Sequence, residues 1–419
     1  MARRDEKKVS HKFRGKKFLV LLTIALLAAL PLFAIEAPQL TAFGPGNDNS
    51  SIPYFNHVFY IMMENNGVGQ IIGNPNATYI NQLITTYGYD SNYYGVTHDS
   101  LANYVAAISG NNWYTYSDNP TQTFNHTNLV DQLEANHISW KAYMESMPSA
   151  AYTGYWYPDN EPSGTSPSTT PSNALYALKH NPFMLFDDIL SNPQRADNVV
   201  PLTQLTTDLN SNNVPQFVWI SPNVCNDMHG QPSGPGNTCP YSDPAALYQD
   251  GDNFLKTWVN AIIDSRSWSG NSAIFITWDE TEYPPGTNAT VFTAPGPDAP
   301  TAPASVFTAN GVPAPTSGVG VFGGGNVPLI VITTQMTGHS QNQDNGHSTG
   351  PITINTYADH YNILRTIEQS WNLGYLGMAS DAAQVQSLTG FFQQGPPHTD
   401  GFQELIQAIE SEFSQLKTR

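Results

Sequence analysis

The run Val58-Phe-Tyr-Ile-Met-Met63 is continuously apolar, of strand length, and ends at two polar residues. Three further runs of this kind follow, at residues 216–221, 273–278 and 327–332. Apolar runs without polar alternation are typical of strands that are buried on both faces, as in a mostly parallel sheet. Helical patterns lie between the runs and after them. The sequence therefore predicts an α/β fold, a three-layer sandwich with a mostly parallel central sheet.

The helical patterns are clearest at residues 78–87, 252–263 and 360–371. Near the C-terminus, apolar residues between 402 and 416 fall on one face of an amphipathic helix. Two long stretches, 147–173 and 284–318, are rich in Pro, Ser, Thr or Ala and read as surface insertions.

The charge of the chain is strongly divided. The first seventeen of 419 residues hold eight Lys or Arg and two acids; removing them from the totals of 16 and 34 leaves eight basic and 32 acidic residues, a net charge of −24. Such a body repels nucleic-acid phosphates, so we expect no nucleic-acid partner. It also repels other anionic substrates, unless cations in the site reverse the local field.

An apolar run at residues 18–35 follows the basic flank. It is typical of a signal peptide or a short N-terminal membrane anchor, and both imply export to the cell surface or beyond. We expect 1–37 to be this segment, 38–54 a linker, and 55–419 a single domain with the two insertions. Membrane contact is expected only through the N-terminal segment.

Two cysteines, Cys225 and Cys239, stand fourteen positions apart. In an exported protein the pair is expected to form a disulfide. The alternative is that both thiolates bind one metal, although the spacing is not C-x-x-C.

Ser100 stands just after a loop and just before the small-residue run that ends at Ser109. A hydroxyl at the N-terminus of a helix lies among unpaired N–H groups and the positive end of the helix dipole, a setting that suits a phosphate or sulfate ester. The alternative for such a serine is a helix N-cap.

Acids follow three of the apolar runs: Glu64, Asp227, and the pair Asp279 and Glu280. In an open parallel sheet, ligands bind beyond the carboxyl ends of the strands. Like charges gathered there are costly unless they are paired or bound to metal, whereas each acid alone could be a solvated loop residue or a helix cap. Oxygen ligands with few histidines favour a divalent cation such as Mg, Ca, Mn or Zn. A metal beside a hydroxyl would make it a nucleophile.

An ordered set of motifs resembles the phosphoesterase family of the alkaline phosphatase superfamily, which holds secreted acid phosphatases and bacterial phospholipases C. The motifs lie at residues 63–65, 95–104, 139–145, 179–183, 220–229, 277–280 and 359–368. The resemblance covers most of residues 55–380 and implies an alkaline phosphatase-like fold and hydrolysis of phosphate esters.

The resemblance also implies site residues. Ser100 matches the nucleophile, and one divalent metal would be held by Glu64, Asn65, Ser100, Asp279 and Glu280. A second metal would be held by Asp227, His229 and His360; alternatively, His229 and His360 donate hydrogen bonds to the phosphoryl oxygens or act as the general acid. Asn103 is expected to bind substrate. His98 is expected either to protonate the leaving group or to shape the loop, and His180 either to reach the phosphoryl pocket or to pack at a helix end.

The chain departs from the family pattern beside the nucleophile. Asp99 and Ala102 stand where the family has prolines. The loss of two prolines loosens the loop, and Asp99 adds a charge that could disfavour an anion or bind metal.

We therefore predict an exported, metal-dependent phosphoesterase that hydrolyses phosphate monoesters through a phosphoserine intermediate, as acid phosphatases do. The substrate would be a small-molecule phosphate ester or a phospholipid. The alternatives are a phospholipase C-type phosphodiesterase and a non-catalytic cell-surface protein that retains the fold.

Overall fold

The computed structural model describes residues 52–115, 117–158, 170–211, 213–281, 323–338 and 351–392. Its centre is an eight-stranded sheet in the order β11-β2-β10-β9-β1-β8-β4-β7. The strands are β1 (His57–Met63), β2 (Gly88–Asp90), β4 (Trp140–Met144), β7 (Val199–Pro201), β8 (Phe217–Ser221), β9 (Ser272–Trp278), β10 (Leu329–Thr333) and β11 (Ile352–Ile354). Two small sheets pair β3 (Tyr93–Tyr94) with β12 (Ala358–Asp359) and β5 (Trp156–Tyr157) with β6 (Tyr176–Ala177).

The large sheet is mostly parallel, as predicted. β1 pairs in parallel with β8 and β9, and β4 pairs in parallel with β7 and β8. β10 runs antiparallel to β9 and β2, and β11 is parallel to β2, so β10 alone is reversed among these eight strands. The four apolar runs that the sequence analysis identified are β1, β8, β9 and β10.

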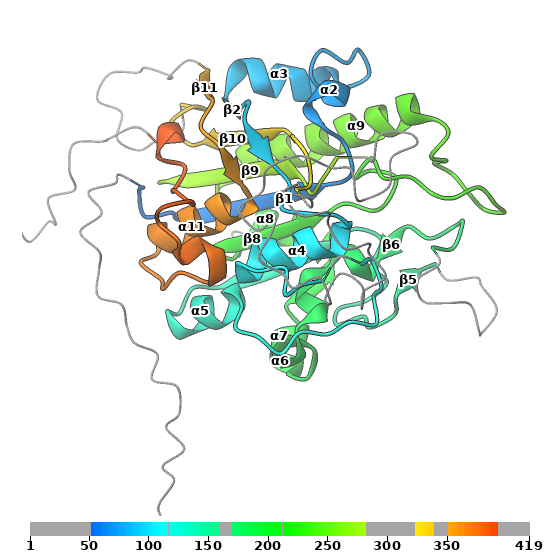
Figure 1. Ribbon diagram of the computed structural model, residues 1–419, viewed down its shortest axis with the longest axis horizontal. Coiled ribbons are helices and arrows are strands. Elements are labelled where there is room, and N and C mark those ends of the chain that lie inside the picture. The colour runs from blue at the N-terminus through cyan, green and yellow to red at the C-terminus, as the bar shows by residue number, and fades with distance from the viewer. Residues whose placement is uncertain are drawn as a thin grey trace, which may run out of the picture. The chain divides into compact units, whose positions relative to one another are not determined.

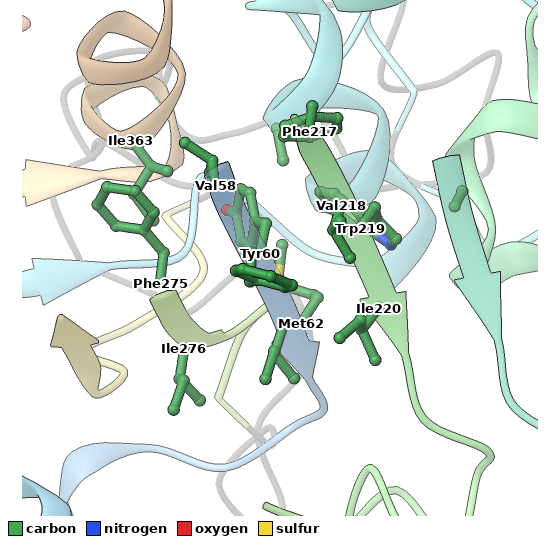
Figure 2. Packing of buried hydrophobic residues seen from close by; sticks show 14 of the residues in the cluster. Val58, Tyr60, Met62, Phe217, Val218, Trp219, Ile220, Phe275, Ile276 and Ile363 are labelled. Carbon is green, nitrogen blue, oxygen red and sulfur yellow. The ribbon is translucent and has the colours of Figure 1, made fainter. Parts of the chain in front are cut away.

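Both faces of the central strands are covered. Every residue of β8, β9 and β10 is buried, and so is every residue of β1 after His57. Because successive side chains of a strand point to opposite faces, complete burial requires helices on both sides. Figure 2 shows this packing, in which the rings of Tyr60 and Trp219 lie 4.6 Å apart between centroids.

The helices are α2 (Val68–Ile71), α3 (Thr78–Thr86), α4 (Ser100–Ser109), α5 (Leu129–Ala135), α6 (Asp187–Leu190), α7 (Pro193–Ala196), α8 (Thr203–Ser211), α9 (Pro244–Ile263) and α11 (His360–Ser370). Short 3₁₀ turns are η1 (Leu178–His180), η2 (Pro182–Leu185), η4 (Gly377–Ser380) and η5 (Thr389–Phe391). In Figure 1, α3 and α9 lie together on one side of the central strands, and α4 and α11 lie together on the other. The predicted three-layer α/β fold is confirmed.

Two of the predicted helices have nearly the expected bounds, whereas the third is longer. α9 begins at Pro244, eight residues before the expected start. Asp243 caps it by accepting a hydrogen bond from the amide of Ala246 at 3.2 Å. Proline in the first turn after an Asp cap is a strong start signal, which the hydrophobic pattern alone missed.

The short strands and β4 were not predicted from the sequence. Lys141 interrupts the apolar pattern of β4, and its ammonium pairs with Asp208 Oδ2 at 2.8 Å. Of the insertion at 147–173, the described part contributes β5. The N-terminal segment 1–37, most of the linker 38–54, the insertion at 284–318 and the C-terminal pattern at 402–416 lie outside the described residues. Each described helix is too short or too polar to cross a membrane.

The predicted disulfide between Cys225 and Cys239 is present, with the two Cα atoms 5.5 Å apart. The bond closes the loop that contains Asp227 and His229. The cross-link therefore fixes the segment that follows β8 at the carboxyl end of the sheet.

Replacing both cysteines by serine is expected to lower the free energy of unfolding by about 3 kcal/mol, because the cross-link closes a loop of about this size. Denaturant titration of the parent and the double variant measures this difference. A reducing agent should destabilise the parent and leave the variant unchanged. A difference below about 0.5 kcal/mol, the range of ordinary surface changes, would contradict the expectation.

Candidate active site

Ser100 is the first residue of α4, and its side chain is buried, with the residue 1% exposed. Its hydroxyl donates a hydrogen bond to Glu64 Oε2 at 3.0 Å, and Glu280 Oε1 lies 3.4 Å away. Glu64 directly follows β1, and Glu280 is the second residue after β9. Because β1 and β9 are parallel neighbours, their carboxyl ends meet at one edge of the sheet. The fold thus brings together the hydroxyl and the acids that the sequence placed at strand ends.

Asn103 holds the loop that precedes Ser100. Its side-chain oxygen accepts hydrogen bonds from the amides of Val96 at 2.8 Å and Thr97 at 3.0 Å. Its amide nitrogen donates to Thr97 O at 2.8 Å and to Glu280 Oε2 at 3.3 Å. These four contacts fix the loop without the two prolines of the family pattern. Asn103, expected to bind substrate, has its side chain engaged within the protein.

Gly95, at the start of the same loop, permits a close approach of backbones. A Cβ at this position would lie 2.4 Å from Asp279 O and 3.1 Å from Gly324 Cα. A side chain here would push the serine loop away from the end of β9, so the glycine is needed for the site to assemble.

A second group of atoms, which could ligate a metal, lies around the other carboxylate oxygen of Glu64. Ligand atoms of Glu64, His180 and His229 all lie within 4.8 Å of one another. His180 Nε2 is 3.3 Å from Glu64 Oε1, and His180 Nδ1 is 3.1 Å from Asp227 Oδ2. Glu64 is therefore shared, with one oxygen facing Ser100 and the other facing His180.

These buried atoms are close together but poorly satisfied. Within the described residues, no well-aligned hydrogen-bond partner reaches Glu64 Oε1, Asp227 Oδ2 or either ring nitrogen of His180. Buried polar atoms are normally paired, so a convergent set without partners indicates a site for an ion. His229 Nδ1 lies 2.9 Å from Gly230 O, which leaves Nε2 to face the cluster.

The pKa shifts of the buried acids and histidines in this cluster also suit the binding of a cation. Burial raises the pKa of Glu64 well above its usual value, and the charges of Asp279 and Asp227 raise it further. Burial likewise raises the pKa of Asp227 well above its usual value and that of Asp279 to about 7. Burial lowers the pKa of His229 to about 4, which keeps the imidazole in its neutral, ligating form. A carboxylate with two neutral imidazoles fits Zn²⁺ or a similar divalent ion.

Asp279, which directly follows β9, contacts both Asn65 and His360. Asp279 Oδ1 accepts a hydrogen bond from the amide of Asn65 at 2.9 Å. His360 Nε2 lies 2.8 Å from Asp279 O, and His360 Nδ1 lies 2.8 Å from the hydroxyl of Tyr93. Both ring nitrogens of His360 therefore lie within hydrogen-bond distance of protein atoms. Asn65 contacts Asp279 through its backbone amide.

His98 lies against Glu280. Its Nδ1 is 2.6 Å from Glu280 Oε2, and the residue is buried. Burial lowers the pKa of His98 to about 3, while burial and the Asp279 charge raise the pKa of Glu280. The neutral imidazole of His98 thus lies beside the Glu280 carboxylate, whose other oxygen is 3.4 Å from the Ser100 hydroxyl.

Two residues of the cluster were given no role from the sequence, although Lys179 is the first residue of the motif at 179–183. Lys179 Nζ lies 2.5 Å from Asp118 Oδ2 and 3.4 Å from His229 Nε2. The position of Lys179 next to His180, in a body with eight basic residues, was an available signal. Asp118 lies in an irregular segment after α4 and carries no sequence signal of its own.

A model of the phosphoesterase family matches residues 74–374, which is most of the chain. The chain belongs to the phosphoesterase family. The family assignment that the motifs implied is confirmed, and the motif residues Ser100, Glu280 and His180 lie within the matched range.

Relatives of this phosphoesterase include two fungal proteins. It is 25% identical over 230 residues to a probable acid phosphatase of Kluyveromyces lactis, covering 54% of this chain and 48% of the relative. It is 27% identical over 255 residues to an acid phosphatase of Aspergillus fumigatus, covering 59% and 50%. The chain thus aligns with about half the length of these curated relatives.

A longer match is to a phosphatidylinositol-3-phosphatase of Mycobacterium tuberculosis, 24% identical over 382 residues, covering 89% of this chain and 95% of the relative. Among solved structures, a protein in the alkaline phosphatase superfamily from Vibrio parahaemolyticus matches with a TM-score of 0.43 and 12% identity, covering 81% of this chain and 71% of the other.

In protein stripped of divalent metal, we expect the free energy of unfolding to fall as the pH rises from about 6.5 to 8.5. The site carboxyls have raised pKa values, so the folded state binds more protons than the unfolded state, and stability is lost as the pH approaches the folded pKa. The histidines with lowered pKa values act in the opposite sense, but their contribution is complete once the pH exceeds about 6.5. Thermal unfolding midpoints in EDTA at the two pH values measure the fall.

Adding excess Zn²⁺ or Mn²⁺ should reduce this fall, because a bound cation stabilises the charged carboxylates. The difference between the slopes with and without metal is the quantity that tests the site, since buried acids elsewhere, such as Glu368, contribute to both. Equal slopes would contradict a metal site at these carboxylates.

Proposed function

We propose that the protein is a metal-dependent phosphatase that hydrolyses phosphate monoesters, with Ser100 as the nucleophile. The observation that carries the proposal is the contact between the Ser100 hydroxyl and Glu64 Oε2, 3.0 Å apart at the first turn of α4. A hydroxyl held by a buried carboxylate at a helix N-terminus is oriented, has a proton acceptor, and faces a region that favours anions.

In the proposed reaction, Ser100 Oγ attacks phosphorus as its proton passes toward Glu64. The bond between phosphorus and the leaving oxygen breaks, and that oxygen takes a proton from water, giving a phosphoserine and the free alcohol, while Glu64 returns its proton to solvent. Water then hydrolyses the phosphoserine, which releases inorganic phosphate and restores the hydroxyl. Glu280 is oriented by His98 and Asn103. It is a second hydrogen-bond acceptor for the Ser100 hydroxyl.

A divalent cation fits between Glu64, His180 and His229, with Asp227 and the Asp279–Glu280 pair nearby. When bound there, such a cation would supply Lewis-acid stabilisation of phosphoryl charge and lower the pKa of a neighbouring hydroxyl. His180, expected either to reach the phosphoryl pocket or to pack at a helix end, takes the role of a metal ligand in this proposal. His360 and Asn65 act by positioning Asp279.

The names of the relatives favour a phosphate monoester as the substrate. The fungal relatives are acid phosphatases and the mycobacterial relative is a phosphatidylinositol-3-phosphatase, by their names. A phosphatase activity on small-molecule or lipid phosphomonoesters is therefore proposed ahead of a phospholipase C-type phosphodiesterase. The intact arrangement of Ser100, Glu64 and Glu280 argues against a non-catalytic protein that merely retains the fold.

We also propose that the protein is exported by its N-terminal hydrophobic segment and acts outside the cytoplasm, as a single catalytic domain from residue 55 onward. The disulfide between Cys225 and Cys239 supports this, because structural disulfides persist in oxidising compartments.

Replacing Ser100 by alanine is expected to reduce turnover of p-nitrophenyl phosphate by at least about 10³-fold, because the attacking oxygen is removed. The assay uses protein stripped with EDTA and reloaded with divalent metal. Ser109→Ala is the matched control: it makes the same change at the other end of α4, where the hydroxyl donates to Val105 O and accepts from Trp113 Nε1. Ser109→Ala should keep activity near that of the parent, and equal rates for Ser100→Ala and the parent would exclude Ser100 as nucleophile.

A further inference from the structure

The ammonium group of Lys179 is embedded in the candidate site. The Lys179 side chain is 5% exposed, and its Nζ lies 2.5 Å from Asp118 Oδ2. It also lies 3.4 Å from Nε2 of His229, which belongs to the candidate metal-ligand group Glu64, His180 and His229. Burial works to lower the pKa of Lys179, but the charges of Asp118 and Glu64 outweigh burial and raise it. The site therefore contains a fixed positive charge that the proposed mechanism has not used.

The carboxylate of Asp118 links this charge to the nucleophile segment. Asp118 Oδ1 accepts a hydrogen bond at 3.0 Å from the amide of Leu101, the residue directly after Ser100. Its other oxygen contacts Lys179. One anionic group thus spans the distance between the buried cation and the backbone amide beside the nucleophile.

The two partners differ in accessibility. The side chain of Asp118 is 33% exposed, whereas that of Lys179 is 5% exposed. Asp118 lies in an irregular segment after α4, and Lys179 lies in η1, directly before His180. Asp118 is therefore the more accessible partner of the pair, and Lys179 is the more deeply buried one.

We propose that Lys179 binds a phosphoryl oxygen of the substrate, and that the Asp118 carboxylate occupies this position until the phosphate displaces it. The inference rests on the proposed phosphatase function and names a substrate-binding residue for it. A phosphoryl group carries more charge than a carboxylate and offers three terminal oxygens in place of two. An ammonium group binds phosphate as a point charge with three donors, so the donor that Asp118 releases is available to a phosphoryl oxygen.

The need for such a residue follows from the charge of the chain. With a net charge of −24 outside the first seventeen residues, the body repels phosphate esters. A buried lysine next to Glu64, His180 and His229 attracts the phosphate ester at the one place where the substrate must bind. Asp118 keeps that charge neutralised in the absence of substrate, which offsets the cost of burying it.

The competing explanation is that the pair only stabilises the fold. Lys141 and Asp208 form a pair of this kind, 2.8 Å apart, with Tyr143 also donating to Asp208 Oδ2 at 2.7 Å. If the Lys179–Asp118 pair were only structural, removing either partner would impair phosphate binding in the same direction. If Asp118 competes with phosphate, the two removals act in opposite directions.

The experiment measures inhibition of p-nitrophenyl phosphate turnover by inorganic phosphate in Asp118→Asn and Lys179→Met. Asp118→Asn keeps an oxygen that can accept from the Leu101 amide but removes the competing charge, so the inhibition constant should fall about tenfold. Lys179→Met removes the binding charge at similar length, so the constant should rise about tenfold or more. Asp208→Asn is the matched control and should leave the constant unchanged.

Calorimetric titration with inorganic phosphate, with metal and in EDTA, gives the same comparison without turnover. A rise or no change for Asp118→Asn would overturn the proposal; if that variant does not fold, Asp118→Ser takes its place under the same criterion. No weakening in Lys179→Met would also overturn it. A parent that hydrolyses the ester while the variants fail these criteria leaves the phosphatase function standing. A parent that binds phosphate with the predicted opposite shifts but hydrolyses no ester refutes the function instead.

Discussion

The structure depends on one electrostatic constraint: four carboxylates, those of Glu64, Asp227, Asp279 and Glu280, are buried at one edge of the sheet. Burial and mutual repulsion disfavour their charged forms, and Lys179 is the cation whose charge acts on three of them. One ammonium group cannot balance four carboxylates. The arrangement is stable at neutral pH only if the acids hold protons or a multivalent cation lies among them.

The fold explains why the acids are gathered there. Parallel neighbouring strands end at the same edge, so side chains that follow β1, β8 and β9 converge without long loops. Helix α4 then places Ser100 against that edge, and the Asn103 contacts close the loop in front of it. The sheet supplies rigidity, because its central strands are fully buried, and the loops supply the chemistry.

Much of this was predictable from the sequence. The strands β1, β8, β9 and β10 are long apolar runs, and the acids that follow β1, β8 and β9 are local signals. β4 was missed because Lys141 breaks its apolar pattern, although that lysine is satisfied by Asp208. The antiparallel direction of β10 has no local signal, since it depends on the path of the chain between strands.

The roles of the histidines were less predictable. His180 and His360 both follow from motifs, but only the fold shows that His180 lies between Glu64 and Asp227 while His360 contacts a backbone carbonyl and Tyr93. The contact of Asp118 with Lys179 joins segments 61 residues apart. Such pairings are set by tertiary packing, which a single sequence does not encode locally.

The central claim is that a divalent cation binds among these acids through Glu64. Anomalous diffraction from crystals grown with Zn²⁺ or Mn²⁺ tests it most directly, because it locates the ion and its ligands together. The account predicts a peak within about 2.0–2.2 Å of Glu64, His180 and His229. Metal-loaded crystals without a peak in contact with Glu64 would contradict the account.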